Sequence, residues 1–343
     1  MPTPVKLLAR SSGRGHRSAA FNWPRGPAAL RALPQLIDTR PDARAEIGAG
    51  LLAESATIAP KYLYDPLGSR LFEAITELPE YYPTRTERAI LATSISDIAA
   101  AVGRGATLID LGAGNCAKAA SLFGALRPAQ YVAIDIADEI LGQSLNGLRQ
   151  SYPGIEMLGL AQDFSAELTL PPRVRAQRRL FFYPGSSIGN FVPGDALRLL
   201  TMIRSRCGSD GRLLIGVDLV KDPAVLEAAY DDALGVTRAF NLNLLNHINV
   251  LIGSDFKLGD FAHRALFNRS LKRIEMHLEA QRDLVVTWPE GMRAFTRGER
   301  IHTENSYKFE LPELTALLQR AGFERVATWT DDRRWFGVCL ASA

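Results

Sequence analysis

Short apolar runs alternate with segments of helical spacing through the middle of the chain, and this pattern predicts an α/β fold. The runs have the length of buried strands, and the segments between them place apolar residues on one helical face. Strands joined by helical crossovers indicate a parallel, doubly wound sheet. The predicted strands are 106–111, 131–136, 155–159, 179–183 and 212–218, and the predicted helices between them are 115–126, 137–150 and 194–206.

Outside this region the pattern is mixed. A loop rich in Tyr, Pro and Gly (61–85) separates two segments of helical spacing near the start of the chain. Alternating runs beyond residue 270 suggest an antiparallel insertion after the fifth strand, and the chain ends on a predicted hairpin. These outer elements are helices 45–58, 86–102, 223–245 and 312–321, strand-like runs 271–278 and 284–288, and hairpin strands 325–330 and 335–341.

A glycine-rich motif follows the first predicted strand. Its sequence is Leu108-Ile-Asp110-Leu-Gly112-Ala-Gly114, and Asp135 ends the next strand. The glycines permit a tight turn and a close approach to a ligand, while a carboxylate at Asp135 can accept from ribose hydroxyls. The spacing alone fits a dinucleotide, S-adenosylmethionine or a structural turn. Asp110 favours S-adenosylmethionine, because a carboxylate there repels a pyrophosphate but suits a sulfonium and an ammonium.

Two later loops at the carboxyl ends of predicted strands carry candidate binding residues. Asp163 and Phe164 follow the third strand, where a carboxylate can accept from an adenine amino group while the ring packs on the base. A helix cap with a core Phe is the structural alternative at this position. The fourth strand leads into an uncharged, Gly- and Ser-rich loop ending at Asn190, which offers both a donor and an acceptor to a second substrate.

The charge of the chain is concentrated near its start. The formal net charge of +3 comes from 40 Lys and Arg against 37 Asp and Glu. Residues 1–44 hold eight basic and two acidic side chains, so this segment is +6 and the remaining 299 residues are −3. The near-balance argues against a nucleic-acid binder. Residues 1–45 have the composition of a flexible extension or a transit peptide.

Other features of the composition exclude further classes. Cys116, Cys207 and Cys339 are too far apart for a CxxC metal site and too few for a disulfide framework. Five scattered histidines without an HExxH motif argue against a zinc enzyme. No run of 18 uncharged apolar residues occurs, so we expect no membrane span. These observations predict a cytoplasmic globular enzyme that holds no metal.

Several longer sequence motifs point to one family. In chain order they are KYLYDPLGS from Lys61, LPEYYPTRTE from Leu78, SIGN from Ser187, DLVKD from Asp218, AYDD from Ala229 and TENSYKF from Thr303. Together with the glycine-rich loop, they resemble the histidine-specific N-alpha-methyltransferases of ergothioneine biosynthesis (the EgtD family). The resemblance covers about residues 46–343.

This resemblance implies a fold and a set of site roles. The fold would be a class I (Rossmann-like) methyltransferase sheet (86–221 plus 309–343), with an α+β substrate-binding domain (46–85 plus 222–308) inserted after strand 5. Residues implied to contact S-adenosylmethionine are Gly112, Lys118, Asp135, Asp163 and Phe164. Residues implied to hold the amino-acid substrate are Asn190 and Tyr230 at its carboxylate, Tyr81, Glu304 and Ser306 at its imidazole, Met276 against the ring, and Tyr64 and Phe72 around the amine.

Each of these residues also has a structural alternative when taken singly. Glu304 fits a solvated strand carboxylate, Lys118 fits a solvent-facing lysine, and Met276 fits an apolar strand face. Tyr64 and Tyr81 fit core aromatics with hydroxyls at the surface. Only the joint occurrence of these sequence motifs in one chain favours the functional roles.

The implied reaction transfers three methyl groups from S-adenosylmethionine to the α-amino group of L-histidine, giving hercynine (trimethylhistidine), the first step of ergothioneine biosynthesis. A free α-amine is partly neutral near pH 7, so we expect no strong general base. Three alternatives stay open: the same chemistry on tryptophan or another aromatic amino acid, a non-catalytic S-adenosylmethionine-binding regulator, and a nicotinamide-dependent oxidoreductase, which Asp110 disfavours. We expect a monomer that binds a small-molecule substrate, and neither nucleic acid nor membrane.

Overall fold

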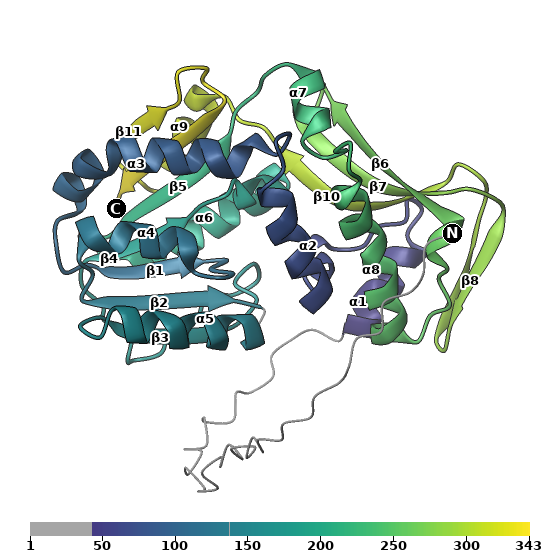
Figure 1. Cartoon of the computed structure of the whole chain (residues 1–343), viewed down its shortest axis with the longest axis horizontal. Coiled ribbons are helices and arrows are strands. Elements are labelled where there is room, and N and C mark those ends of the chain that lie inside the picture. Colours follow the sequence, from purple (N-terminus) through teal and green to yellow (C-terminus); the bar gives the residue numbers. More distant parts are fainter. Residues whose placement is uncertain (1–42, 137) are drawn as a thin grey trace, which may run out of the picture. The chain divides into compact units, whose positions relative to one another are not determined.

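The computed structural model describes residues 43–136 and 138–343, which contain a central seven-stranded sheet (Figure 1). Its strands are β1 (Thr107–Leu111), β2 (Gln130–Asp135), β3 (Glu156–Ala161), β4 (Arg179–Tyr183), β5 (Arg212–Asp218), β11 (Arg325–Thr330) and β12 (Phe336–Ser342). They lie in the order β11-β12-β5-β4-β1-β2-β3, with β1 to β5 parallel and β12 antiparallel to both of its neighbours. The predicted parallel sheet that ends in a hairpin is confirmed, and it is the sheet of class I methyltransferases.

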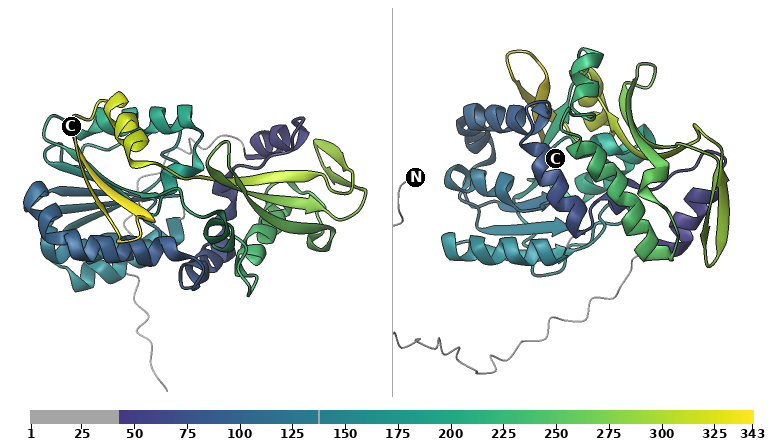
Figure 2. Two further views of the ribbon diagram at one scale, coloured as in Figure 1. Left: turned by 90° about the horizontal axis from the view of Figure 1, so that it is seen from above. Right: turned by 45° about the vertical axis from the view of Figure 1, so that its right-hand side comes forward.

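Helices cover both faces of this sheet (Figures 1 and 2). Successive side chains of a strand point to opposite faces, so Leu108 and Ile109 of β1 belong to two different core clusters. Because both faces are buried, every residue of β1 is buried as well. The covering helices are α3 (Tyr82–Val102), α4 (Ala117–Leu126) and α5 (Asp138–Ser151) on the Leu108 face, and α6 (Pro193–Cys207) and α9 (Leu311–Arg320) on the Ile109 face.

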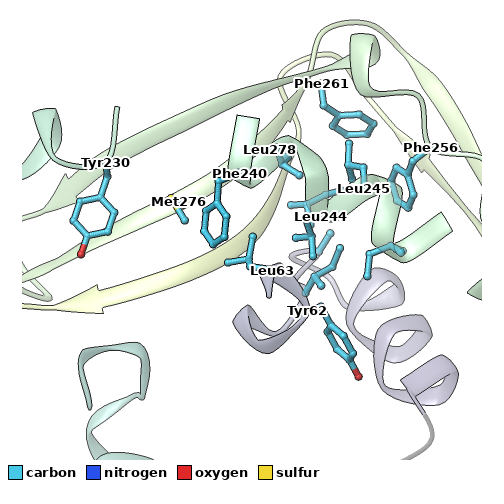
Figure 3. Packing of buried hydrophobic residues seen from close by; sticks show 14 of the residues in the cluster. Tyr62, Leu63, Tyr230, Phe240, Leu244, Leu245, Phe256, Phe261, Met276 and Leu278 are labelled. Atoms are coloured by element: carbon cyan, nitrogen blue, oxygen red, sulfur yellow. The ribbon is translucent and has the colours of Figure 1, made fainter. Parts of the chain in front are cut away.

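A second group of elements surrounds a core of its own (Figure 3). It contains a three-stranded antiparallel sheet, in the order β10-β7-β6, and the hairpin β8-β9. The buried apolar residues of this core come from 47–82 and 226–301. The elements are α1 (Ala43–Leu52), η1 (Pro60–Leu63), α2 (Pro66–Thr76), α7 (Pro223–Ala228), α8 (Val236–Ile252), η3 (Leu258–Asp260), β6 (Phe261–Asn268), β7 (Arg273–Ala280), β8 (Leu284–Trp288), β9 (Gly291–Phe295) and β10 (Arg300–Tyr307).

The segment 61–85, expected as a loop, is largely helical instead. It contains most of η1, all of α2 and the first turn of α3. Pro66 and Pro83 lie in the first turns of α2 and α3, where a missing N–H removes no helical hydrogen bond. Asp65 caps α2 by accepting from the Gly68 amide at 2.7 Å. These prolines therefore start helices here, whereas the sequence analysis took them as signs of a loop.

Two predicted helices have different bounds in the structure. The first, predicted over 45–58, ends at Leu52, and the Ala56 carbonyl and Ile58 amide then bond to His302 of β10 at 2.8 and 2.9 Å. The second, predicted over 223–245, is divided into α7 and α8. Gly235 takes a left-handed conformation between them, and the Asp232 carboxylate caps α8.

Residues 1–42 lie outside the described part of the chain, and so does most of the predicted basic extension. Within the described part, no helix combines the length and the apolar character needed to cross a bilayer. The proposed division into a substrate-binding domain and a methyltransferase domain stays a prediction.

Candidate active site

The loop after β1 forms an open backbone cradle. Gly112 and Gly114 have φ angles of +72° and +51°, and no heavy atom lies within 4 Å of the position that a Cβ would take on either residue. The Gly112 and Ala113 amides donate to the Ile134 carbonyl at 2.9 and 3.1 Å, and the Gly114 amide donates to Asp135 Oδ2 at 2.8 Å. The loop is thus tied to the end of β2, while the space beside its glycines can take a ligand.

Asp110, two residues before this loop, is buried in the sheet. Its Oδ2 accepts from the Tyr131 hydroxyl at 2.8 Å, whereas its Oδ1 has no hydrogen-bond partner among the described residues. Burial raises the pKa of the Asp110 carboxyl to about 7, and the Tyr131 hydrogen bond acts against this shift. A buried carboxylate oxygen without a partner next to a glycine cradle fits a cationic ligand such as S-adenosylmethionine.

Asp163 and Phe164 lie in the loop after β3. Asp163 Oδ1 accepts from the Ser165 amide at 3.0 Å, which is the local cap of the structural alternative. Asp163 Oδ2 lies 3.4 Å from Lys61 Nζ, which also pairs with Glu46 at 2.8 Å. The Phe164 ring meets Tyr183 edge-on with centroids 5.9 Å apart. Both residues are partly buried after the carboxyl end of β3, and an adenine contact by either stays a proposal.

Lys118 is held by an ion pair within the protein. Its Nζ lies 2.6 Å from Oε2 of Glu87, a fully buried residue of α3. The other Glu87 oxygen accepts from the Gly185 amide at 2.8 Å. Lys118 therefore joins α4 to α3 and to the loop after β4, and it is not simply a solvent-facing lysine.

Five aromatic side chains from distant parts of the chain pack together near the carboxyl end of the parallel strands. Tyr64 meets Phe72 and Phe240 with centroids 5.6 Å apart in each case. Phe72 meets Tyr81 at 6.1 Å, and Tyr81 meets Tyr230 at 6.2 Å. Burial, followed by nearby negative charge, raises the pKa values of the three tyrosines well above their usual value, so their hydroxyls stay protonated. We call this set the aromatic cluster; Phe240 was not among the predicted site residues.

A β-bulge in β10 decides which side chains face the aromatic cluster. The pairing with β7 shifts between His302 and Glu304, which makes Thr303 the extra residue. The Thr303 hydroxyl is fixed by a hydrogen bond to Asn241 Oδ1 at 2.8 Å. Because side chains alternate along a strand, the bulge puts Glu304 and Ser306 on the opposite face from His302. Glu304 and Ser306 are accordingly buried, at 8% and 3% exposure.

Glu304 is a buried carboxylate opposite Met276 of β7, which is part of the second core. Burial raises the pKa of the Glu304 carboxyl to about 7, and the Lys308 ammonium acts against this shift. The charge of Glu304 in turn helps to raise the pKa values of Tyr64, Tyr81 and Tyr230. Glu304 is therefore not a solvated strand residue, and a ligand with an N–H group would give it the partner that burial demands.

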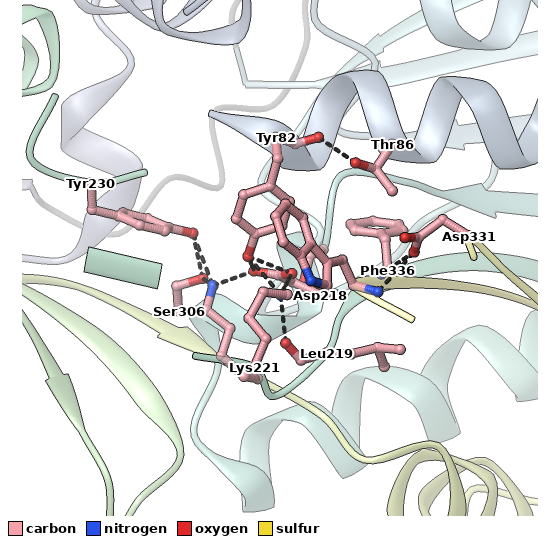
Figure 4. A network of polar contacts seen from close by, with 12 residues as sticks. Tyr82, Thr86, Asp218, Leu219, Lys221, Tyr230, Ser306, Asp331 and Phe336 are labelled. Atoms are coloured by element: carbon pink, nitrogen blue, oxygen red, sulfur yellow. Dashed lines mark hydrogen bonds and ion pairs between the residues drawn. The ribbon is translucent and has the colours of Figure 1, made fainter. Parts of the chain in front are cut away.

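A buried ammonium connects this strand to the central sheet. Lys308 Nζ, whose side chain is fully buried, lies 2.7 Å from Ser306 Oγ, 3.1 Å from the Tyr230 hydroxyl and 2.8 Å from Asp218 Oδ2. The Tyr230 and Ser306 oxygens lie 2.7 Å from each other. Figure 4 shows Tyr230, Ser306 and Asp218 around this point. The carboxyl end of β5 is thus joined directly to two predicted substrate-binding hydroxyls.

Asp218 has a second set of partners. The Tyr82 hydroxyl donates to it at 2.7 Å, and Lys221 Nζ pairs with it at 2.5 Å (Figure 4). Burial would raise the pKa of the Asp218 carboxyl, but Lys308 and Lys221 outweigh burial and lower it. Tyr82, Glu87, Asp218, Lys221 and Lys308 were not among the predicted site residues, although each lies in one of the sequence motifs that resemble the family. For Asp218, Lys221 and Lys308, the available signal was a charged residue at or just after the end of a predicted or alternating strand.

Asn190 ends η2 (Ser187–Asn190), which packs against β10. A Cβ on Gly189 would lie 2.8 Å from the Tyr307 carbonyl oxygen, so only glycine permits this approach. Asn115 Nδ2 in the loop after β1 donates to Glu73 Oε1 of α2 at 3.3 Å, so the glycine loop contacts the helix that carries Phe72 of the aromatic cluster. The predicted residues for cofactor and substrate therefore gather at one end of the sheet.

Comparison with known proteins identifies the family. The model of the family described as "Histidine-specific methyltransferase, SAM-dependent" matches residues 43–343. The chain belongs to this family. It is 40% identical over 304 residues to the histidine N-alpha-methyltransferase of Mycolicibacterium smegmatis, covering 87% of this chain and 94% of that protein. It is 34% identical to ergothioneine biosynthesis protein 1 of Neurospora crassa over 78% of this chain and 31% of that protein.

Among solved structures, an S-adenosylmethionine-dependent methyltransferase from Clostridium acetobutylicum matches with a TM-score of 0.45 and 11% identity, over 80% of this chain and 98% of that one. Family membership, together with the sheet order and the glycine cradle, makes this chain an S-adenosylmethionine-dependent methyltransferase. The oxidoreductase and the non-catalytic regulator are therefore set aside.

Proposed function

We propose that this methyltransferase transfers three methyl groups from S-adenosylmethionine to the α-amino group of L-histidine, giving hercynine, as the first step of ergothioneine biosynthesis. The names of the relatives in Mycolicibacterium smegmatis and Neurospora crassa support the substrate and the pathway. The observation that carries the proposal is the buried Glu304 carboxylate, which faces the aromatic cluster beside Ser306 and Tyr230. A ring with two nitrogens can satisfy both Glu304 and Ser306.

The cofactor roles follow from the cradle at the end of β1. We assign the backbone at Gly112 to the close contact, Asp135 to the ribose, and Asp163 with Phe164 to the adenine. Asp110 supplies negative charge, and Lys118 lies at the start of α4 beside its partner Glu87. S-adenosylmethionine supplies a methyl group activated by its sulfonium. The protein's own part is to fix its position against the amine.

The substrate roles follow from the network on β10. Asn190 and Tyr230 would hold the carboxylate, and Tyr81, Glu304 and Ser306 the imidazole, with Met276 against the ring. Tyr64 and Phe72 would surround the amine. A site built from buried hydrogen-bonding groups rejects side chains that cannot pair with them, by roughly 10⁴-fold or more.

The amine needs orientation more than it needs a base. A usable fraction of an α-amine with a pKa of about 8 is neutral near pH 7. Holding nucleophile and methyl group in line can lower the barrier by roughly 7–11 kcal/mol. The edges and faces of Tyr64 and Phe72 accept both an ammonium and a quaternary nitrogen, so a methylated product can stay in place for the next transfer.

Mass spectrometry of histidine incubated with the protein and S-adenosylmethionine tests the proposal. We expect species with one, two and three added methyl groups, and a final product that no longer reacts with amine reagents. Accumulation of a singly methylated product alone would contradict the three-step assignment. Methylation of tryptophan in place of histidine would support the alternative substrate. The two-domain organisation, the monomeric state and the cytoplasmic location stay predictions.

A further inference from the structure

Lys308 has an unusual set of contacts for a lysine that no solvent reaches. An ammonium has three N–H donors and no acceptor, and three oxygens surround this one: Asp218 Oδ2, Ser306 Oγ and the Tyr230 hydroxyl. All three donors are therefore used inside the protein. The charge of Asp218 is balanced without Lys308 as well, because Lys221 and Tyr82 also contact it.

The two hydroxyls that Lys308 contacts share one proton. Their oxygens lie 2.7 Å apart, a distance that requires a hydrogen between them. Of the two hydroxyl protons, one is thus used internally and one is left for a ligand. Because Lys308 holds both oxygens next to one ammonium, the two hydroxyls stay hydrogen-bonded to each other. They therefore cannot both donate to a ligand.

We propose that Lys308 is a positioning residue of the amino-acid site: it holds the Tyr230 and Ser306 oxygens within one hydrogen bond, so that only one of their two hydroxyl protons is free for the substrate. The substrate carboxylate takes that proton, so Tyr230 donates to the carboxylate, Ser306 donates to Tyr230, and the substrate ring donates an N–H to Ser306. If Tyr230 instead donated to Ser306, only lone pairs of the Tyr230 oxygen would face the substrate carboxylate, and no hydrogen bond could form between them. This inference rests on the proposed function, since it assumes that an amino acid with an imidazole binds here.

The direction has a consequence at Glu304. A neutral imidazole has one N–H, and that group is used at Ser306. The second ring nitrogen and the Glu304 carboxylate are then both acceptors. A hydrogen bond between them requires one added proton, which either group can carry. The ionisable groups that interact electrostatically with Glu304 are Lys308, whose three N–H groups are already used, and the hydroxyls of Tyr64, Tyr81 and Tyr230, whose pKa values are raised; none of them supplies this proton. Ligand binding above pH 7 therefore takes up a proton from solution.

Titration calorimetry with hercynine at pH 8 measures this proton directly, because its quaternary nitrogen does not titrate. Titrations in buffers of different ionisation enthalpy give the number of protons taken up. We expect close to one for the unmodified protein. In Lys308→Met the hydroxyls can separate and both donate outward, so the uptake falls toward zero and the Kd for hercynine rises at least tenfold. The matched control Lys221→Met also loses a partner of Asp218, but it keeps the uptake and a Kd within twofold.

A second variant keeps the test valid if Lys308→Met does not fold. Ser306→Ala removes the acceptor for the ring N–H, which then turns to Glu304, so uptake also falls toward zero. Binding of hercynine to the unmodified protein without proton uptake would overturn the inference, and so would equal uptake in Lys308→Met and Lys221→Met. If hercynine does not bind and histidine is not methylated, the proposed function itself fails.

Discussion

The glycine cradle and the amino-acid site lie at the same end of the sheet but are built in different ways. The cradle comes from one continuous segment and presents backbone, with two positive φ angles and empty space where side chains would stand. The proposed amino-acid site comes from segments up to 242 residues apart, from Tyr64 to Ser306, and presents side chains that hold one another. The cradle therefore depends on the shape of one loop, and the proposed amino-acid site on the direction and charge of a network.

Removing the Glu304 carboxylate should give the largest effect. Glu304→Ala leaves a substrate N–H without a partner in a buried site, so we expect kcat/KM for histidine to fall about 10²–10³-fold. The Kd for S-adenosylmethionine, measured by calorimetry, should stay within twofold. Glu275→Ala is the matched control, because Glu275 lies on the adjacent strand and pairs with Arg273 and Asn268. A similar loss of activity in both variants would contradict a specific role of the Glu304 carboxylate in holding the substrate.

A Cβ in the cradle should give the next largest effect. Gly112→Ala fills the open space beside the loop, so we expect the Kd for S-adenosylmethionine to rise about 10–100-fold. Gly105→Ala is a close control: Gly105 also has a positive φ, +79°, and open space, but it precedes β1 and lies at its other end. Both variants should lose about 1 kcal/mol of unfolding free energy from the left-handed alanine. Equal cofactor affinity in the two variants would contradict the cradle.

The pH dependence of cofactor binding should be smaller but diagnostic. Burial raises the pKa of Asp110 to about 7, with further shifts from Asp135, Lys118 and Glu87, and a cationic ligand needs the ionised form. Affinity for S-adenosylmethionine is therefore lost as the pH falls through 7, and we expect a Kd about five- to tenfold higher at pH 6 than at pH 7.5. Calorimetry on Asp110→Asn should give a weaker affinity that is nearly flat over this range. A flat profile in the unmodified protein would place the cation away from Asp110.

The smallest effect should come from Lys61, which links Asp163 to Glu46 of α1. Its ion pairs with Glu46 and Asp163 are partly exposed to solvent, and such pairs contribute little. Lys61→Ala should change the unfolding free energy by less than about 1 kcal/mol in urea titrations. The Kd for S-adenosylmethionine should stay within threefold. A tenfold loss of cofactor affinity would show that Lys61 holds Asp163 in its binding position.

The difference between the sites also explains what could be predicted from the sequence. The sheet, its closing hairpin and the loop at Gly112 follow from local patterns, because glycine spacing and apolar runs report directly on backbone. The role of Lys308 does not, since its three partners come from separate segments and only the fold brings them together. The bulge at Thr303 also escapes a pattern argument, because one unpaired residue reverses the face of every side chain after it.

Proline and glycine gave the clearest errors. Pro66 and Pro83 begin helices where a loop was predicted, and Gly235 with Asp232 divides a segment predicted as one helix. In each case the same residue type fits two structures, and the capping contacts of the folded chain decide between them. Glu304 shows the same limit: as a single residue it fits a solvated strand, and only its burial beside Lys308 gives it a role.

A competition experiment measures directly whether the site selects an imidazole side chain. The protein is given S-adenosylmethionine and an equimolar mixture of the twenty common amino acids, and mass spectrometry follows each of them with time. We expect that histidine alone gains methyl groups, up to three, and that Glu304→Ala loses this preference. Methylation of tryptophan or phenylalanine at a rate comparable to that of histidine would contradict the assignment of Glu304 and Ser306 to an imidazole.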